Sequence, residues 1–198
     1  MLSDIYLGIR RTKCEVKEEG YDYSNLLDEL RRKTKLNLDN LKDHPTIRAL
    51  RDFYWRIGID PTKIRPSSEA LMRRFLKYGK IPKINNVVDA GNIASLETLI
   101  PIGLYDLDKV KGNLTIRFAK EGEEFLDING EKKLLSSNSI VLSDDLGILH
   151  LFPHRDANRT KITRETTKLL IVACGVKGID RNLVEKAADR VLEILAKS

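Results

Sequence analysis

The spacing of apolar side chains changes near residue 100. Before that point they recur every three or four positions, which is the spacing of one face of a helix. Four helices are therefore predicted. Ser24 is expected to cap the first, the second covers about residues 45–58, Ser67 or Ser68 is expected to cap the third, which ends near Gly79, and the fourth covers about residues 85–99. A proline at the start of the second helix and glycines after the second and third support these limits. Gly91 lies inside the fourth helix and predicts an interruption or a close approach of a ligand or another backbone.

Outside this helical region the apolar positions alternate or form short buried runs, as strands do. The N-terminal residues 4–16 predict one or two short strands. Asn129-Gly130 predicts a two-residue hairpin turn, and Asp180 predicts the N-cap of a terminal helix. Further strands are expected over residues 114–118, 125–128, 132–135, 139–142, 148–152 and 169–174. Helices gather in the first half and strands in the second, which favours an α+β fold. No repeat or linker divides the chain, so one domain over residues 1–198 is predicted.

Composition and charge add little to this picture. The chain has 198 residues, of which 41% are hydrophobic and 32% are charged, as in a globular protein. No apolar run has the length of a membrane span, and the N-terminus lacks a secretory signal pattern, so a soluble cytoplasmic protein is predicted. The net charge of +6 is compatible with a nucleic-acid partner. Dense surface ion pairs are the alternative explanation.

Cysteines and standard motifs indicate neither a metal nor a cofactor. Cys14 and Cys174 are far apart and lack metal-ligand spacing, so two reduced structural cysteines are expected, with a disulfide as the alternative. The chain has no phosphate-binding glycine loop with Lys-Ser or Lys-Thr, no nucleophile elbow and no zinc spacing. No cofactor and no metal are therefore predicted.

Polar residues inside apolar surroundings indicate a lined pocket between Ile64 and Asp106. Buried polar groups are costly unless they are paired, so such a pattern has little place in a plain core. Asp89 and Asn92 are three positions apart and share a helix face, where they are suited to hold an amine or a ribose hydroxyl. The alternative is that Asp89 braces neighbouring backbone and Asn92 bonds locally.

Two flanking segments carry further candidates. Ser67 and Glu69 suit the first turn of a helix, and Arg65 just before them either pairs with Glu69 or receives a phosphate. His154 lies in a polar loop, residues 152–160, between two predicted buried strands. Such loops often carry function. A surface turn with an Arg155–Asp156 pair is the alternative.

Several of these motifs resemble one family in order along the chain. They are Arg65–Leu71, Val87–Asp89 with Asn92, Pro101–Gly103 with Tyr105–Asp106, and Ile116–Arg117 before Glu121–Glu123. Over about residues 45–178 the chain resembles the B3/B4 region of the phenylalanyl-tRNA synthetase β subunit, and more closely the freestanding B3/4-domain proteins. In the synthetase this region is an editing domain that removes tyrosine wrongly attached to the phenylalanine tRNA. The resemblance implies an α+β fold with a mixed sheet, flanking helices and a site in the sheet–helix crevice.

The resemblance also implies site residues. Asp89 and Asn92 match the Asp and Asn of the family's Val-Asp-x-x-Asn segment. Gly103 stands where many synthetases carry a His that lines the editing pocket, so the resemblance does not carry tyrosine specificity over to this chain. Asp156 or Asn158 is near the place of the family's later acidic residue. Nothing resembles the synthetase's catalytic core or anticodon-binding domain.

The function expected from these observations is hydrolysis, in trans, of the ester that links an amino acid to the 3′ end of a mischarged tRNA. The enzyme must mainly position a water and stabilise an oxyanion. The expected catalytic residues are Asn92, His154 and Arg155, and the expected substrate-binding residues are Arg65, Ser67, Glu69, Asp89, Gly103, Arg117 and Asp156. The expected partner is tRNA, with no membrane and no stable protein partner. The alternatives are a non-catalytic RNA-binding module and a hydrolase or binder of small amino-acid derivatives that is independent of RNA.

Overall fold

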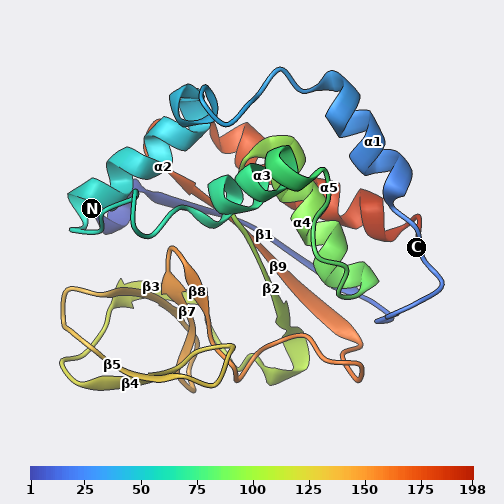
Figure 1. The fold of residues 1–198 in the computed structure, drawn as a ribbon. Coiled ribbons are helices and arrows are strands. Elements are labelled where there is room, and N and C mark those ends of the chain that lie inside the picture. The colour runs from blue at the N-terminus through green and yellow to red at the C-terminus, as the bar shows by residue number, and fades with distance from the viewer.

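A three-stranded sheet lies at the centre of the computed structural model, which describes residues 1–198 (Figure 1). Its strand order is β1 (Ile5–Lys13), β9 (Lys168–Val176) and β2 (Ile102–Asp106). β9 pairs antiparallel with both neighbours. Its nine residues are buried except for the first, which is why its sequence is an almost unbroken apolar run.

Helices cover both faces of this sheet. Leu169, Ile171 and Ala173 of β9 pack with α4 (Asn86–Thr98) and α5 (Arg181–Leu195). The alternate residues of β9 face the other way and pack with α2 (Pro45–Arg56) and α3 (Ser67–Tyr78). α1 (Ser24–Lys33) lies outside these helices, at the end of the molecule that carries the C-terminus in Figure 1. None of the helices combines the length and apolar character needed to cross a membrane.

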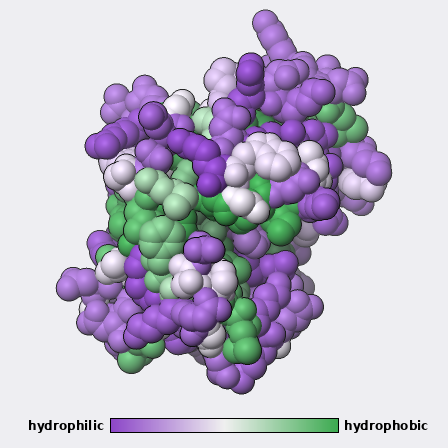
Figure 2. All heavy atoms as spheres, turned by 90° about the vertical axis from the view of Figure 1, so that its left-hand side faces the viewer, coloured by the Kyte–Doolittle hydropathy of each residue, from purple (hydrophilic) through white to green (hydrophobic).

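The middle of the chain forms a small lobe of short strands, drawn at the lower left of Figure 1. It contains a four-stranded sheet in the order β3 (Thr115–Phe118), β6 (Ile140–Ser143), β7 (Ile148–Phe152) and β8 (Arg155–Asp156), and a hairpin of β4 (Glu123–Leu126) and β5 (Lys132–Leu135). Figure 2 shows apolar atoms gathered on one side of the molecule, between a hydrophilic helical region above and the hydrophilic small lobe below. Core residues of β6 and β7 pack against α2 and the central sheet at this junction.

The α+β class is confirmed, but the sheets are not mixed. Every strand pairing is antiparallel. β1 and β2 do run parallel to each other, but β9 lies between them, so they never pair. Cys14 and Cys174 are both free thiols, as the favoured reading expects.

Two local predictions need correction. Helix α4 continues through Gly91 without interruption. A Cβ at Gly91 would lie 2.6 Å from Cδ1 of Leu104, so the glycine lets the helix pack closely on β2. The turn between β4 and β5 is longer than two residues, because the buried Asp127 accepts hydrogen bonds from the backbone N–H groups of Asn129 and Glu131 and holds a wider loop.

Candidate functional site

A pocket of about 210 Å³ lies where the central sheet, two helices and the small lobe meet. The N-terminal turns of α3, the middle of α4, the start of β2, one residue of β9 and the β7–β8 turn all contribute side chains. The lining residues are Ser67, Leu71, Asn92, Ser95, Pro101, Ile102, Gly103, His150, Pro153, His154, Asp156 and Cys174. The structure therefore brings together Ser67, Asn92, Gly103, His154 and Asp156 of the residues expected from sequence.

Helix α4 places Asn92 in the pocket because its first turn is fixed by two other asparagines. The side chain of Asn85 accepts a hydrogen bond from the N–H of Val88 at 2.8 Å and caps the helix. The side chain of Asn86 bonds to backbone of Glu15 and Lys17. Asn92 takes no part in the side-chain hydrogen bonds of this helix, so its amide is available to a ligand.

A tight hairpin places His150 beside Asp156. β7 and β8 pair antiparallel, with His150 opposite Asp156 and with Pro153-His154 at the turn. Nδ1 of His150 lies 2.8 Å from Oδ1 of Asp156. Because a carboxylate only accepts, Nδ1 donates, and Nε2 of the neutral ring is left as an acceptor. The hydroxyl of Tyr105 donates to the same oxygen at 3.0 Å, so Asp156 is held from two sides.

Asp156 is the one carboxylate among the lining side chains, and no Lys or Arg lines the pocket. Burial lowers the pKa of His154 to about 4, helped by His150, Arg155 and Lys133. Burial also raises the pKa of the Cys174 thiol to about 12 and, together with Asp156, holds the pKa of Tyr105 well above its ordinary value. The lining is therefore polar, with one carboxylate and no Lys or Arg side chain.

Two buried nitrogens of the lining have no hydrogen-bond partner: Nε2 of His150 and Nδ1 of His154. Leaving a buried polar atom unpaired costs about 1–3 kcal/mol, so such atoms gather where a ligand completes them. Oδ2 of Asp156 adds a free acceptor, because both hydrogen bonds of that side chain go to Oδ1.

Tyr105 explains why position 103 is a glycine. The two residues lie on the same face of β2. A Cβ at Gly103 would collide with the Tyr105 hydroxyl and would lie 2.8 Å from Cζ and 2.9 Å from Cε2 of that ring. The phenol therefore fills the space that a His would need at this position.

The Gly103→Ala variant is expected to lose about 1–3 kcal/mol of unfolding free energy, because Tyr105 is buried and has no room to move aside. In a Tyr105→Ala background the same substitution should cost much less. Urea denaturation of the four proteins of this double-mutant cycle measures the coupling. Equal costs in both backgrounds would show that Tyr105 is not what excludes a side chain at position 103.

Two expected site residues lie in the helical layer outside the pocket lining. Asp89 is buried and accepts hydrogen bonds from the Tyr21 hydroxyl at 2.6 Å and from the N–H of Ile84 at 3.0 Å. Glu69 is fully buried and pairs with Arg51 at 2.5 Å and with Arg73 at 2.8 Å. Both carboxylates brace the helices that shape the pocket.

The three expected arginines are also outside the lining. Arg117 forms a two-point ion pair with Glu123 inside the small lobe. Arg155 is directed toward the buried Asp127, at 3.7 Å. Arg65 is half-exposed, 4.0 Å from Glu69, two residues before Ser67 of the lining. Of the three, Arg65 has the most exposed side chain.

Sequence reasoning left out His150, Tyr105 and Cys174, which line or support the pocket. A signal for His150 was present. Pro153-His154 between two apolar-polar stretches predicts a hairpin, and the three-residue connection 152–154 that the structure shows places His150 opposite Asp156. Nothing in the local sequence marks Cys174, because it lies in an apolar strand.

A second cavity, larger than the pocket, is less suited to chemistry. It measures about 490 Å³ and lies between α1, α4 and α5. Its charged side chains already pair with one another, Lys33 with Glu29 and Arg190 with Glu97. No group of three or more His, Cys, Asp or Glu side chains in the chain is placed to hold a metal ion.

Relatives of known name are similar to part of this chain. The phenylalanine–tRNA ligase beta subunits of Rhodopseudomonas palustris and Fusobacterium nucleatum are 37% identical over 106 residues and 33% identical over 113 residues, which cover 54% and 57% of the chain. That of Aquifex aeolicus is 30% identical over 140 residues, or 71% of the chain. These matches span only 13%, 14% and 15% of the respective relatives.

A solved structure is also similar, an N-terminal fragment of the phenylalanyl-tRNA synthetase beta subunit from Pyrococcus horikoshii. It is 18% identical, with a TM-score of 0.48, over 56% of this chain and 40% of that one. The family model described as "B3/4 domain" matches residues 49–198, which include the whole pocket. The chain belongs to the B3/4 domain family.

Proposed function

We propose that this protein hydrolyses the ester of a mischarged aminoacyl-tRNA in trans. One observation carries the proposal: a pocket of amino-acid size combines a single carboxylate with buried polar atoms that have no partner. The relationship to a tRNA-synthetase subunit supports a role connected with tRNA. The editing activity itself comes from the family resemblance.

The α-ammonium of the aminoacyl group is the substrate feature that Asp156 suits best. Its side chain is about one-third exposed, and Oδ2 is free of hydrogen bonds within the chain. Tyr105 and His150 hold the carboxylate from the side of Oδ1, so Oδ2 is preorganised. The Asn92 amide, on another wall of the pocket, is free to bond the same ligand.

The N-terminus of α3 is suited to the ester carbonyl. Ser67 is the first residue of this helix and lines the pocket, and no side chain caps the helix. The free N–H groups of a first turn and the helix dipole favour negative charge. As water attacks the carbonyl carbon, the negative charge that develops on the carbonyl oxygen would be stabilised there.

Proton transfer needs an acceptor and a return path. A neutral histidine nitrogen of the pocket, at His150 or His154, takes one proton from the attacking water. The tetrahedral intermediate then breaks its bond to the ribose oxygen, and that oxygen takes the proton back. The products are the free amino acid and the tRNA hydroxyl. His150 has the advantage of a tautomer fixed by Asp156.

The arginines have separate roles in this proposal. Arg65 is exposed beside the first turn of α3 and is available to a phosphate of the tRNA end. Arg155 would have to leave Asp127 to reach the substrate. Glu69, Asp89 and Arg117 support the walls instead of contacting the ligand.

The experiment is release of amino acid from a panel of correctly charged and mischarged tRNAs by the purified protein. We expect hydrolysis of one or a few mischarged species, well above the spontaneous rate. Salt-dependent tRNA binding without hydrolysis of any species would instead favour a non-catalytic RNA-binding module. If the protein hydrolyses or binds free amino-acid esters and neither binds nor hydrolyses charged tRNA, a hydrolase or binder of small amino-acid derivatives that is independent of RNA would be favoured.

A further inference from the structure

A second hollow of the surface lies at the far end of the helices that form the pocket. Arg74 and Tyr78 of α3 line it, together with Lys80 and Lys83 of the segment that follows. We call these four residues the basic hollow. No acidic side chain lines it, so it differs from the pocket, which has a carboxylate and no Lys or Arg in its lining.

One face of α3 connects the two places. Ser67 and Leu71 line the pocket, and Arg74 and Tyr78 line the basic hollow. These positions follow one another at spacings of four, three and four, so they share a helix face. All four are exposed or half-buried. At about 1.5 Å per residue, the face runs roughly 16 Å from the pocket to Tyr78.

Helix α4 also connects the basic hollow with the pocket, and its chain runs from the basic hollow toward the pocket, opposite to that of α3. Lys83 lies in the basic hollow just before α4 begins, and Asn92 in the middle of α4 lines the pocket. Val88, between them and on the same face as Asn92, is half-buried. α3 and α4 pack against each other, so two neighbouring helices lead from the basic hollow to the pocket.

The cations of the basic hollow form no ion pair within the chain. Arg51, Arg73 and Arg190 pair with glutamates, whereas Arg74, Lys80 and Lys83 take part in none of the ion pairs of the structure. Lys83 lies 4.7 Å from the centre of the Tyr21 ring and is near enough to Asp22 to contribute to the lowered pKa of that carboxyl, but it forms no ion pair. Such cations are available to an anionic partner.

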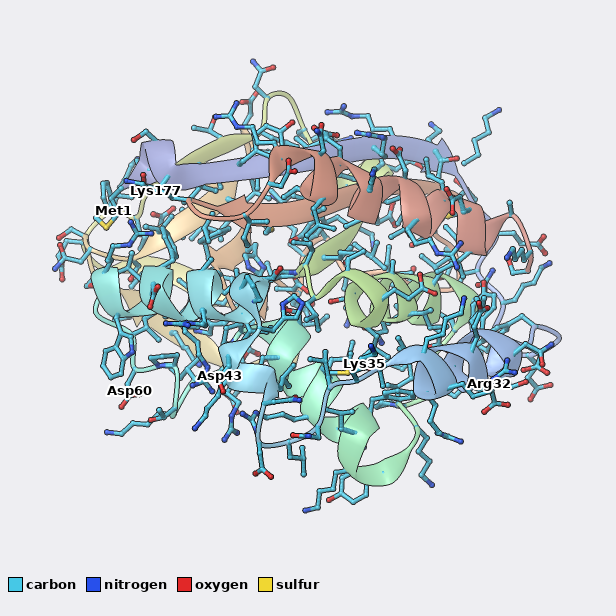
Figure 3. The ribbon with its side chains drawn as sticks, turned by 90° about the horizontal axis from the view of Figure 1, so that it is seen from above. Met1, Arg32, Lys35, Asp43, Asp60 and Lys177 are labelled. Carbon is cyan, nitrogen blue, oxygen red and sulfur yellow. The ribbon has the colours of Figure 1, made fainter.

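The basic hollow also presents an aromatic face and lies beside further positive charge. Tyr78 is 59% exposed, with Nζ of Lys77 5.1 Å from the centre of its ring. Arg31 of α1 donates to the backbone oxygen of Gly79, so the basic end of α1 lies next to the end of α3. Figure 3 shows this end of α1, where Arg32 is labelled, along the same edge of the molecule as α3. Cations beside an open aromatic ring are typical of surfaces that track single-stranded nucleic acid.

We propose that the basic hollow binds the phosphate backbone of the RNA strand whose aminoacylated 3′ end enters the pocket. At about 3.4 Å per phosphate along a stacked strand, roughly 16 Å corresponds to the last four or five nucleotides. Arg74, Lys80 and Lys83 bind phosphates, and Tyr78 stacks on a base. The inference rests on the proposed function, because the ester substrate identifies the RNA as a charged tRNA.

The test compares two triple variants with the same change of charge. R74Q/K80Q/K83Q removes the cations of the basic hollow. K120Q/K132Q/K186Q removes three exposed lysines of other elements. Binding of uncharged tRNA is measured over a salt series, and hydrolysis is measured on an aminoacyl-tRNA and on the matching 3′-aminoacyladenosine, which reaches only the pocket.

We expect the first variant to bind tRNA at least tenfold more weakly at low salt, with the slope of log K against log salt reduced by about 2. Its hydrolysis of 3′-aminoacyladenosine should stay within twofold of the unmodified protein, and the second variant should bind tRNA within twofold. Unchanged tRNA binding in the first variant, or an equal loss in both, would overturn the inference. So would a variant that keeps tRNA binding but loses binding to phosphatidylserine vesicles. If the unmodified protein hydrolyses neither substrate, the proposed function fails, and the tRNA-binding comparison still decides whether the basic hollow binds RNA.

Discussion

Asp156→Asn is expected to lower kcat/KM for deacylation about 100-fold, the largest effect of any single substitution in the pocket. The amide oxygen of Asn can still accept from Tyr105 and His150, so the pocket keeps its shape. Only the charge that faces the substrate ammonium is lost. Removing one partner of a desolvated charge pair costs about 2–5 kcal/mol, and each 1.4 kcal/mol is a factor of ten in rate.

Asp52→Asn is the matched control, because Asp52 is an exposed carboxylate of α2 outside the pocket. Its activity should stay within twofold. Both variants should unfold in urea close to the unmodified protein. If Asp156→Asn were as active as Asp52→Asn, the ammonium would be bound elsewhere and the assignment of Asp156 would be wrong.

Glu69→Gln is expected to cause the largest loss of stability, about 2–4 kcal/mol. Glu69 is fully buried, and its two closest partners, Arg51 and Arg73, are about one-fifth exposed. Removing the carboxylate leaves two poorly solvated guanidinium groups without their counter-charge. For a chain of this size the midpoint of thermal unfolding should fall by roughly 5–15 °C. Glu124→Gln, which breaks a fully exposed pair with Lys132, should change it by no more than about 2 °C.

The ion pairs of Glu69 with Arg51 and Arg73 also make the unfolding free energy depend on pH, in a direction that the pKa shift of Glu69 fixes. Burial alone would raise the pKa of Glu69, but the hydrogen bonds from Arg51 and Arg73 outweigh it and lower the pKa below its ordinary value. A carboxylate with a lowered pKa stabilises the fold fully above its unfolded pKa and loses that contribution as the pH falls through its folded pKa. The difference in unfolding free energy between the unmodified protein and Glu69→Gln should be constant from pH 7 to 5 and shrink below about pH 4. A difference that grows on acidification would contradict the ion pair.

Much of the fold follows from local sequence. His44-Pro45, Asn85 and Asp180 place the starts of three helices, and the structure puts His44, Asn85 and Asp180 at the N-caps. The antiparallel order of the central sheet did not follow. β9 inserts between β1 and β2 from residues far along the chain, and no local pattern encodes that pairing.

The candidate site was only partly predictable, for a related reason. Asn92 stands out as a polar residue beside apolar ones, Ser67 suits the first turn of a helix, and His154 lies in a polar loop between apolar strands. The structure brings the three to one pocket. Asp89 stands out equally, but its hydrogen bond to Tyr21, 68 residues away, occupies it within the core. The periodicity of the sequence shows which helix face carries polar residues where apolar ones are expected. It does not show whether the partner is a ligand or a distant part of the chain.

The role of Tyr105 lies beyond periodicity altogether. Its apolar ring fits the buried face of β2, and only the structure shows that it overlies Gly103 and bonds Asp156. The departure from the synthetase pattern at Gly103 is thus accompanied by a different polar group in nearly the same place. Tyr105, Asp156 and His150 form one hydrogen-bonded group at the pocket.

The most direct test of the central claim is the deacylation panel, run on each aminoacyl-tRNA beside its N-acetylated form. Acetylation removes the ammonium and leaves the ester and the tRNA unchanged. If the pocket hydrolyses an ester whose ammonium is held by Asp156, the free-amine form of at least one mischarged tRNA will be deacylated, and its N-acetylated form at least tenfold more slowly. Equal hydrolysis of both forms, or hydrolysis of neither across the panel, would contradict the account.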